Sequence, residues 1–387
     1  KYKVRGVIMT FKDINVSEKL IVGLKKQNIT EPTPIRVQAY KHIMNKRDLI
    51  ACSSTGSGKT LAYLLPIISQ LNPESKYIQA LVLVPTQELA IQVSEQFDLL
   101  CSNSDINYKS IFLIGDGNIN RQIDALKSKP AVVIGTPARV YQLIKMKKLR
   151  VHDVKHLVID EADRLIDKTY YENVLSIRKS LMKYTQVLMF SASIDKKTRK
   201  AANEISYNPV SLDISKDTNN KDIIPKTIKH YYIIADRRER IETLRKIAKA
   251  VKSEKAMIFI NTKYDLEESL QKLQYHKYSV SALSGNLDKF AKRKAIDDFK
   301  SGKVNYLLTT DIGARGLQID DVDTIINVNL PEDSKDYLHR AGRCGRNGNS
   351  GVCISIITEN ELNKIKQYQK QFNINIVARK LYNGKLV

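Results

Sequence analysis

The stretch DLIACSSTGSGKTLAYLLPII, residues 48–68, joins a short apolar run to a helix-forming run through a glycine-rich turn. Between a strand and a helix, such a turn lets successive backbone N–H groups close around phosphate oxygens, and the helix N-terminus adds partial positive charge. Lys59 is then expected to reach the β and γ phosphates of a nucleotide, and the Thr60 hydroxyl a magnesium ion. The full pattern has glycine at position 53, where this chain has serine. The residues expected to surround the phosphates are Ser54, Thr55, Gly56, Ser57, Gly58, Lys59 and Thr60.

A second stretch, HLVIDEADRL at residues 156–165, closes an apolar run with the carboxylates of Asp160, Glu161 and Asp163. Like charges this close resist burial unless a cation or a chemical task compensates for them. We expect Asp160 to hold magnesium through water and Glu161 to polarise the water that attacks the γ-phosphate. An acidic helix N-cap would explain Asp160 or Asp163, but not all three carboxylates. Together the two stretches favour an ATPase.

Short β-branched runs alternate with longer helical stretches in both halves of the chain, which predicts an α/β fold with mostly parallel sheets flanked by helices. From about Val210 the pattern breaks into the polar stretch SLDISKDTNNKDIIPK, typical of an exposed connection. The expected organisation is an N-terminal domain at residues 1–210, a short linker at 211–225, a C-terminal domain at 226–370 and a basic tail at 371–387.

The 387 residues include 64 Lys and Arg against 41 Asp and Glu, a formal net charge of +23. Such an excess favours a polyanionic partner, with nucleic acid as the leading candidate and a merely soluble basic protein as the alternative. No apolar run reaches the roughly 18 residues of a membrane span. The N-terminus KYKVRG lacks the apolar core of a signal peptide. We therefore expect no membrane association and a cytoplasmic location.

Taken in order, SSTGSGKT, PTQELA, TPAR, DEAD, SAS and HRAGRCGR resemble the motifs of the DEAD-box RNA helicases, ATP-dependent RNA remodelling enzymes of superfamily 2. The resemblance runs from Phe11 to about Val352. It implies two RecA-like domains that bind ATP, magnesium and RNA across the cleft between them. It also implies RNA-stimulated ATP hydrolysis that unwinds short RNA duplexes or remodels ribonucleoprotein contacts, in a chain that we expect to be a monomer.

The resemblance assigns roles to further residues. Arg343 and Arg346 resemble arginine fingers, whose planar, permanent charge suits the γ-phosphate. Ser191 and Ser193 resemble an interdomain relay, in which a hydroxyl could bond to Asp163 or His339; a simple strand-end cap is the alternative for Ser193. Contacts to the RNA backbone are implied for loop residues at strand ends, with weak sequence preference and strong salt dependence. These residues are Pro85, Thr86, Gly115, Thr136, Pro137, Arg139, Asn261, Thr262, Thr310 and Arg315.

The sequence departs from the family around the base and the ribose. The family places glutamine after PTPI to read adenine, whereas this chain has Arg36. Arginine only donates hydrogen bonds, while the adenine edge needs a donor and an acceptor, so we expect a weaker preference for ATP over GTP. Phe11 stands where the family stacks an aromatic ring on adenine. Gly316 and Gln318 are expected near the nucleotide, and Gln318 replaces the aspartate that usually contacts the ribose.

Two other functions stay open from the sequence. One is an RNA-binding scaffold that uses ATP only to lock onto RNA. The other is a DNA translocase of the same superfamily. No RNP-type aromatic motif is present, so base stacking is not expected to be the main mode of RNA binding.

Overall fold

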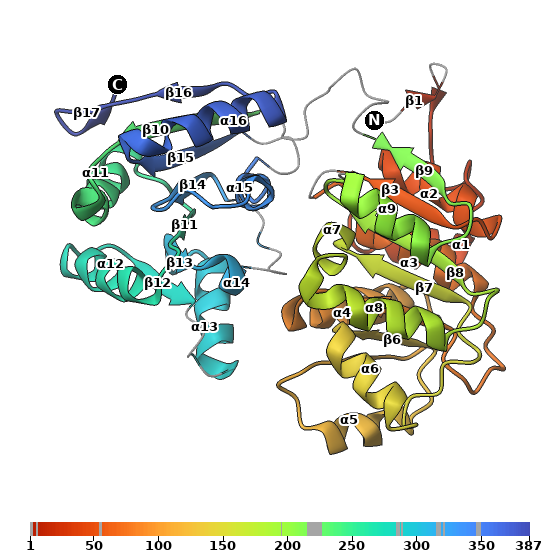
Figure 1. Ribbon diagram of the computed structural model, residues 1–387. Coiled ribbons are helices and arrows are strands. Elements are labelled where there is room, and N and C mark those ends of the chain that lie inside the picture. Colours follow the sequence, from red (N-terminus) through yellow and green to blue (C-terminus); the bar gives the residue numbers. More distant parts are fainter. Residues whose placement is uncertain are drawn as a thin grey trace. The chain divides into compact units, whose positions relative to one another are not determined.

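The computed structural model describes residues 3–4, 7–53, 56–194, 196–214, 227–283, 287, 289–314, 319, 322–345 and 350–387. The chain divides into two compact units, Lys1–Asn219 and Asn220–Val387. Each unit is a sheet of parallel strands with helices packed on it (Figure 1). The predicted α/β class is confirmed.

The first unit contains a seven-stranded sheet in the order β5-β6-β4-β7-β8-β3-β9. All its pairings are parallel. The strands are β3 (Leu49–Cys52), β4 (Ala80–Leu83), β5 (Ser110–Leu113), β6 (Val132–Gly135), β7 (His156–Asp160), β8 (Gln186–Ser191) and β9 (Val210–Asp213). The helices are α1 (Glu18–Lys25), α2 (Pro34–Met44), α3 (Lys59–Gln70), α4 (Gln87–Asn103), α5 (Ile119–Leu126), α6 (Pro137–Lys145), α7 (Ala162–Leu165), α8 (Lys168–Ser180) and α9 (Lys196–Ile205). Two antiparallel strands of two residues each, β1 (Lys3–Val4) and β2 (Val7–Ile8), precede them.

Both faces of this sheet are covered, as the continuous apolar strands require. Side chains alternate between the faces of a strand. Along β4, Ala80 and Val82 belong to one buried cluster, and Leu81 and Leu83 belong to the other. The strand ends that carry polar residues are therefore held between two packed layers.

The second unit contains a seven-stranded parallel sheet in the order β12-β13-β11-β14-β15-β10-β16. When the strands of each seven-stranded sheet are counted from the first in the sequence, β3 or β10, both sheets have the order 3-4-2-5-6-1-7. The strands are β10 (Ile228–Ile234), β11 (Ala256–Phe259), β12 (Val280–Leu283), β13 (Tyr306–Thr309), β14 (Thr324–Asn327), β15 (Gly351–Ile357) and β16 (Ile376–Ala378). The helices are η1 (Arg237–Glu239), α11 (Arg240–Val251), α12 (Lys263–Tyr275), α13 (Lys289–Lys300), α14 (Asp311–Ala314), α15 (Ser334–Ala341), η3 (Glu359–Glu361) and α16 (Leu362–Phe372). A short pair, β17 (Leu381–Tyr382) and β18 (Lys385–Leu386), lies beyond them.

Two expected boundaries differ from the structure. Residues 211–213, which we expected in the linker, belong to β9 and pair with β3; residues 215–225 of that linker lie outside the described part. Within 371–387, which we expected to be a basic tail, residues 376–378 form β16 and pair with β10. Both strands are short, and neither has the long apolar run of a central strand. Pairing with the neighbouring strand, β3 or β10, therefore makes each of them a strand.

In the parts of the chain that the structure describes, every helix is too short or too polar to traverse a lipid bilayer.

Two buried histidines make both units sensitive to acid. Burial lowers the pKa of His156 and of His230, each to about 4. The unfolded chain binds a proton to histidine near pH 6.5, so between pH 6.5 and 4 it binds more protons than the folded chain, and stability falls as the pH falls. Each histidine should cost its unit up to about 3 kcal/mol over this range.

The measurement is the free energy of urea unfolding at pH 7 and pH 5, for the native chain and for His230→Gln. The variant should lose less stability on acidification, since glutamine does not titrate. The exposed His152 provides the comparison variant, His152→Gln, which keeps both buried histidines. Equal losses in all three proteins would contradict the assignment.

Candidate active site

The turn after β3 has the backbone shape expected of a phosphate-binding loop. Gly56 has φ 78° and Gly58 has φ 86°, left-handed conformations that favour glycine. Gly58 precedes the first residue of α3, Lys59. The Lys59 Nζ donates a hydrogen bond to the Ser53 carbonyl at 2.6 Å, so the ammonium lies over its own loop. Ser57 and Thr60 are also described, whereas Ser54 and Thr55 lie outside the described residues.

The carboxylate at the end of β7 is tied to the helix that follows this loop. Asp160 is buried, and its Oδ2 accepts a hydrogen bond from the Tyr63 hydroxyl of α3 at 2.9 Å. Burial raises the pKa of Asp160 to about 6, while the nearby positive charge of Lys59 acts in the opposite direction. Tyr63 was not singled out from the sequence. Its place one helical turn after Lys59, in an otherwise aliphatic run, was the available signal.

Glu161 occupies a strained position at the same edge. Its backbone lies in the left-handed region, at φ 50° and ψ 50°, where it precedes the short helix α7. Its N–H donates to Asp160 Oδ1 at 2.9 Å. The Glu161 side chain is 20% exposed, with Arg164 Nε at 3.6 Å from Oε2. A non-glycine residue in this conformation costs about 1–3 kcal/mol, and such strain concentrates at functional sites.

The third carboxylate meets the hydroxyls of the SAS motif. The Ser193 hydroxyl donates to Asp163 Oδ2 at 3.3 Å, and the Asp163 N–H donates to the Ser191 hydroxyl at 3.3 Å. The Ser191 hydroxyl in turn donates to the Ser193 carbonyl at 2.6 Å. Ser191, Ser193 and Asp163 therefore lie together as expected, while their role as a relay stays a prediction. His339 belongs to the second unit, where it is buried.

Two residues expected at the base occupy other environments. The Arg36 Nε donates to the Gly58 carbonyl at 3.4 Å, and burial lowers the pKa of this guanidinium to about 10. Arg36 thus braces the phosphate loop. Phe11 is buried in the core cluster, and its carbonyl accepts a hydrogen bond from the Val16 N–H at 3.1 Å. The expected stacking of Phe11 on adenine stays a prediction, and in this structure the ring is 3% exposed.

The loops expected to contact RNA in the first unit are partly engaged in local structure. Arg139 is buried and donates to the carbonyls of Gly115 and Gly117. Its guanidinium holds this turn with two of its five donors, and a contact from Arg139 to RNA phosphate stays a prediction. The Thr86 hydroxyl accepts a hydrogen bond from the Leu89 N–H and caps α4. Pro85 is buried before that helix, and Thr136 and Pro137 begin α6.

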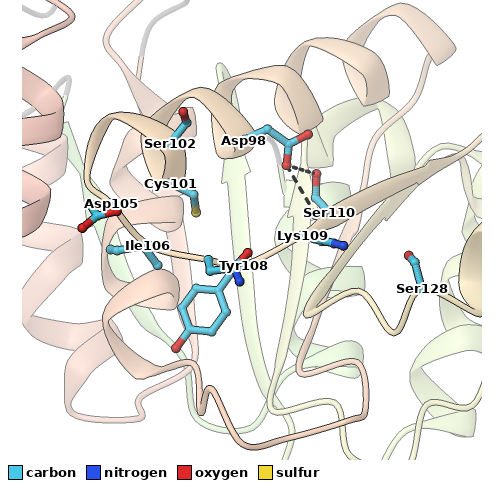
Figure 2. A pocket seen from close by; sticks show the side chains of 10 residues that line it. Asp98, Cys101, Ser102, Asp105, Ile106, Tyr108, Lys109, Ser110 and Ser128 are labelled. Atoms are coloured by element: carbon cyan, nitrogen blue, oxygen red, sulfur yellow. Dashed lines mark hydrogen bonds between the residues drawn. The ribbon is translucent and has the colours of Figure 1, made fainter.

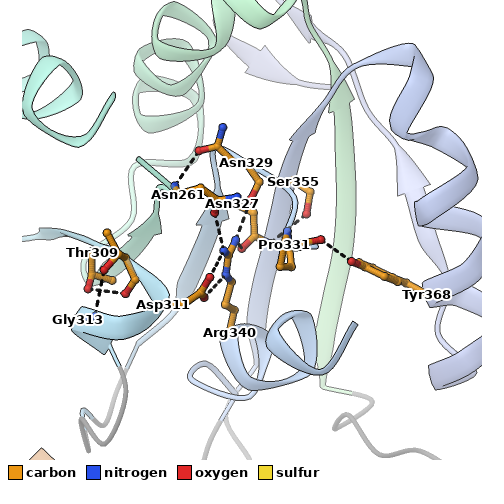
Figure 3. A network of polar contacts seen from close by, with 11 residues as sticks. Asn261, Thr309, Asp311, Gly313, Asn327, Asn329, Pro331, Arg340, Ser355 and Tyr368 are labelled. Carbon is orange, nitrogen blue, oxygen red and sulfur yellow. Dashed lines mark hydrogen bonds and ion pairs between the residues drawn. The ribbon is translucent and has the colours of Figure 1, made fainter. Parts of the chain in front are cut away.

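Arg340 organises the corresponding edge of the second unit (Figure 3). It is 2% exposed and makes a bidentate pair with Asp311, with Nε and Nη2 each 2.6 Å from a carboxylate oxygen. The same guanidinium donates to Asn261 Oδ1 at 2.9 Å, to Asn327 Oδ1 at 3.1 Å and to the Asn329 carbonyl at 2.8 Å. These five bonds use all five donors of the side chain.

The network fixes the loops that precede and follow it. Asn261, an expected RNA contact, is held by Arg340, and the Arg343 N–H donates to the Arg340 carbonyl at 3.1 Å. Thr262 caps α12 through the Asp265 N–H, and the Thr310 hydroxyl accepts from the Gly313 N–H at 3.1 Å. No role was assigned to Arg340 from the sequence, although it is the first arginine of HRAGRCGR. Arg315, Gly316, Gln318 and Arg346 lie outside the described residues.

A cavity of about 580 Å³ in the first unit lies away from these residues. Figure 2 shows its lining, where Asp98 accepts hydrogen bonds from the hydroxyl and the N–H of Ser110. Ser110 is the first residue of β5. Since the strands are parallel, their first residues lie at the sheet edge opposite Asp160 and the phosphate loop. We therefore exclude this cavity from the candidate active site.

The comparisons with known proteins agree with this geometry. The DEAD/DEAH box helicase model matches residues 33–201, and the helicase conserved C-terminal domain model matches residues 239–348. DEAD-box ATP-dependent RNA helicase CshC of Bacillus cereus is 36% identical over 94% of this chain and 91% of its own length. Probable ATP-dependent RNA helicase YfmL of Bacillus subtilis is 35% identical over 92% of this chain and 93% of its own length.

A solved structure titled S. cerevisiae Dbp5 bound to RNA and ADP BeF3 has a TM-score of 0.85 and 28% sequence identity, and the match covers 95% of both chains. The two seven-stranded sheets are thus the RecA-like domains that the motifs implied. With motifs, fold and relatives in agreement, the chain belongs to the DEAD-box family of ATP-dependent RNA helicases.

Proposed function

We propose that this chain hydrolyses ATP in response to RNA and uses the cycle to unwind short RNA duplexes or remodel ribonucleoprotein contacts. The hydrogen bond from Tyr63 to Asp160 carries the proposal, because it joins the phosphate-loop helix to the carboxylate strand. Relatives covering nearly the whole chain are ATP-dependent RNA helicases by name.

The first unit supplies the groups that act on the phosphates. Backbone N–H groups of the loop and the Lys59 ammonium bind the β and γ phosphates, which replace the Ser53 carbonyl as the partner of Nζ. The residues fit a magnesium ion. Asp160 is a buried carboxylate bonded to helix α3, which also carries the Thr60 hydroxyl. Magnesium is held by few protein oxygens and several waters. When bound, magnesium offsets negative charge on the phosphate oxygens. The Glu161 carboxylate orients the attacking water and accepts its proton.

The second unit supplies the arginines. We propose that Arg343 and Arg346 meet the γ-phosphate when the chain closes around ATP and RNA. The fixed position of Arg340 supports this, since the Arg343 N–H is bonded to its carbonyl. Because Lys59 and the arginines belong to different units, hydrolysis requires both units to bind the same nucleotide. The hydrogen bond from Ser193 to Asp163 lies next to Asp160 and Glu161 in the chain. We propose that it couples closure of the two units to hydrolysis.

RNA is proposed to contact loops at the carboxyl ends of the strands, mostly through its backbone. Pro85, Thr86, Gly115, Thr136, Pro137, Arg139, Asn261, Thr262, Thr310 and Arg315 remain the proposed contacts, and Arg139 also supports the Gly115 turn. Backbone contacts carry little sequence information and weaken steeply with salt. A monomeric state, other ribonucleoprotein partners and a cytoplasmic location belong to this proposal.

The test compares ATP hydrolysis and strand displacement with RNA and with DNA of equal length. We expect RNA to stimulate hydrolysis, DNA to stimulate it little, and a short RNA duplex to be separated. ATP-dependent RNA binding without strand release would favour the scaffold. Strong stimulation by DNA with unwinding of long tracts would favour the translocase, and hydrolysis independent of RNA would contradict the proposal.

A further inference from the structure

One phenylalanine of the second unit is exposed far beyond the others. All eight phenylalanines lie within the described residues, and six of them are at most 3% exposed. Phe112 is 40% exposed, whereas Phe290 is 80% exposed. Burying a phenylalanine side chain is worth about 1.5–3 kcal/mol, so the folded chain leaves most of that gain unused at Phe290.

The helix that carries Phe290 explains why it cannot turn inward. On α13, Ala295 and Phe299 are buried and form the face packed on the sheet. Residues three and four positions after Phe290 are Arg293 and Lys294, both exposed, and these spacings share one face of a helix. Phe290 therefore stands on the solvent face, beside two cations. The Arg293 Nε also lies 3.8 Å from the Asp297 carboxylate on the same face, so phosphates would compete with this exposed ion pair.

The start of α13 belongs to the sheet edge where the proposed RNA contacts lie. Leu283 at the end of β12 is in register with Thr309 of β13, and Thr309 is in register with Phe259 of β11. The chain continues from these last two strands into Thr310 and Asn261. A Cβ atom placed on Gly313 would lie 3.0 Å from the Leu283 carbonyl, so α14 packs against the end of β12, from which α13 follows (Figure 1).

We propose that Phe290 stacks on an unpaired base of the bound RNA strand, with Arg293 and Lys294 drawing the flanking phosphates to the same helix face. The inference rests on the proposed function and adds a base contact to backbone contacts. An aromatic ring among cations is the combination that holds single-stranded nucleic acid with little sequence preference, because every base has a π face. The net charge of +23 favours RNA over a protein partner at this surface.

The chain contains no tryptophan, which permits a direct test. Phe290→Trp introduces a single indole whose emission should fall when a base stacks on it. The titrant is a ten-nucleotide oligoadenylate, with AMP-PNP and magnesium present. An abasic oligomer of the same length and charge supplies the comparison, and it should leave the emission nearly unchanged.

Tyr275→Trp is the matched control. Tyr275 is 83% exposed and ends α12, which runs from the end of β11 toward the start of β12, so it lies at the opposite edge of the sheet. Oligoadenylate should leave its emission unchanged. Equal quenching at the two positions, or equal quenching by the abasic oligomer, would overturn the proposal.

Affinity supplies the second measurement. Phe290→Ala should weaken oligoadenylate binding by roughly 5- to 150-fold, Phe290→Leu nearly as much, and Phe290→Tyr little, because stacking needs an aromatic ring. The dependence of affinity on salt should keep its slope, since no phosphate contact is removed. Unchanged affinity of Phe290→Ala, or a lower oligomeric mass of that variant that shows Phe290 binding a second copy, would overturn the inference alone. Absence of RNA binding by the native chain would overturn the proposed function.

Discussion

Replacement of Glu161 by glutamine is expected to lower the RNA-stimulated ATPase rate by about 10²- to 10⁴-fold, the range of general-base catalysis. Glutamine keeps the size of the side chain and accepts a hydrogen bond, but it cannot take a proton from water. The left-handed backbone at φ 50° holds the side chain at the edge of the sheet beside Asp160. That backbone is unaffected by the exchange, so RNA affinity in the presence of ATP should be retained.

The measurement is the steady-state ATPase rate of the native chain and of Glu161→Gln, with and without RNA. The control is Glu204→Gln, the same chemical change on α9, where Glu204 accepts a hydrogen bond from the Tyr171 hydroxyl at 2.7 Å. The control should keep the native rate. A Glu161→Gln chain that hydrolyses ATP at the native rate would remove the assigned base.

Replacement of Arg340 by lysine is expected to cost about 3–5 kcal/mol of the stability of the second unit, as for other broken buried pairs. Lysine has three donors and no planar fork, so it cannot keep the bidentate pair with Asp311 together with the bonds to Asn261, Asn327 and Asn329. The guanidinium also lies 5.0 Å from the centroid of the Phe259 ring, a cation–π contact in a buried setting.

Urea unfolding at neutral pH measures this loss, and Arg245→Lys is the control. Arg245 also donates to a carboxylate at 2.6 Å, that of Glu242, but the pair is partly exposed on one helix, and the exchange should cost less than about 1 kcal/mol. When Arg340→Lys is combined with Asp311→Asn, the double variant should lose less stability than the sum of the two single losses. Equal losses for the two lysine variants would show that the buried network is not decisive.

The sequence predicts features whose residues are consecutive. The phosphate loop is such a feature, since Gly56, Gly58 and Lys59 lie within four positions and their backbone conformation follows from residue type. The same holds for the three carboxylates after β7. The bond from Ser193 to Asp163 was within reach because both follow neighbouring strands, β8 and β7.

Contacts that depend on strand order were missed. Tyr63 and Asp160 are 97 positions apart, and their bond requires α3 to lie against the end of β7. Arg139 donates to the carbonyls of Gly115 and Gly117, more than twenty positions away in the sequence, and the motif TPAR alone does not indicate those two bonds. Arg340 forms hydrogen bonds with residues at the ends of three different strands, and no local sequence pattern predicts that these residues meet.

The identical strand order of the two sheets means that one architecture occurs twice in the chain, and the two copies differ in the turn after their first strand. In the copy that begins with β10, the position of the glycine turn is taken by ADRRE, residues 235–239, which contains no glycine. A cavity of about 770 Å³ opens there, and its lining includes the carboxylates of Asp236, Glu239, Glu359 and Glu361. The lining also includes Arg237 and Arg240, so its four carboxylates outnumber its two cations, a balance that disfavours a triphosphate. Within the described residues, the turn shape expected of a phosphate-binding loop thus follows the first strand of the first sheet and not that of the second.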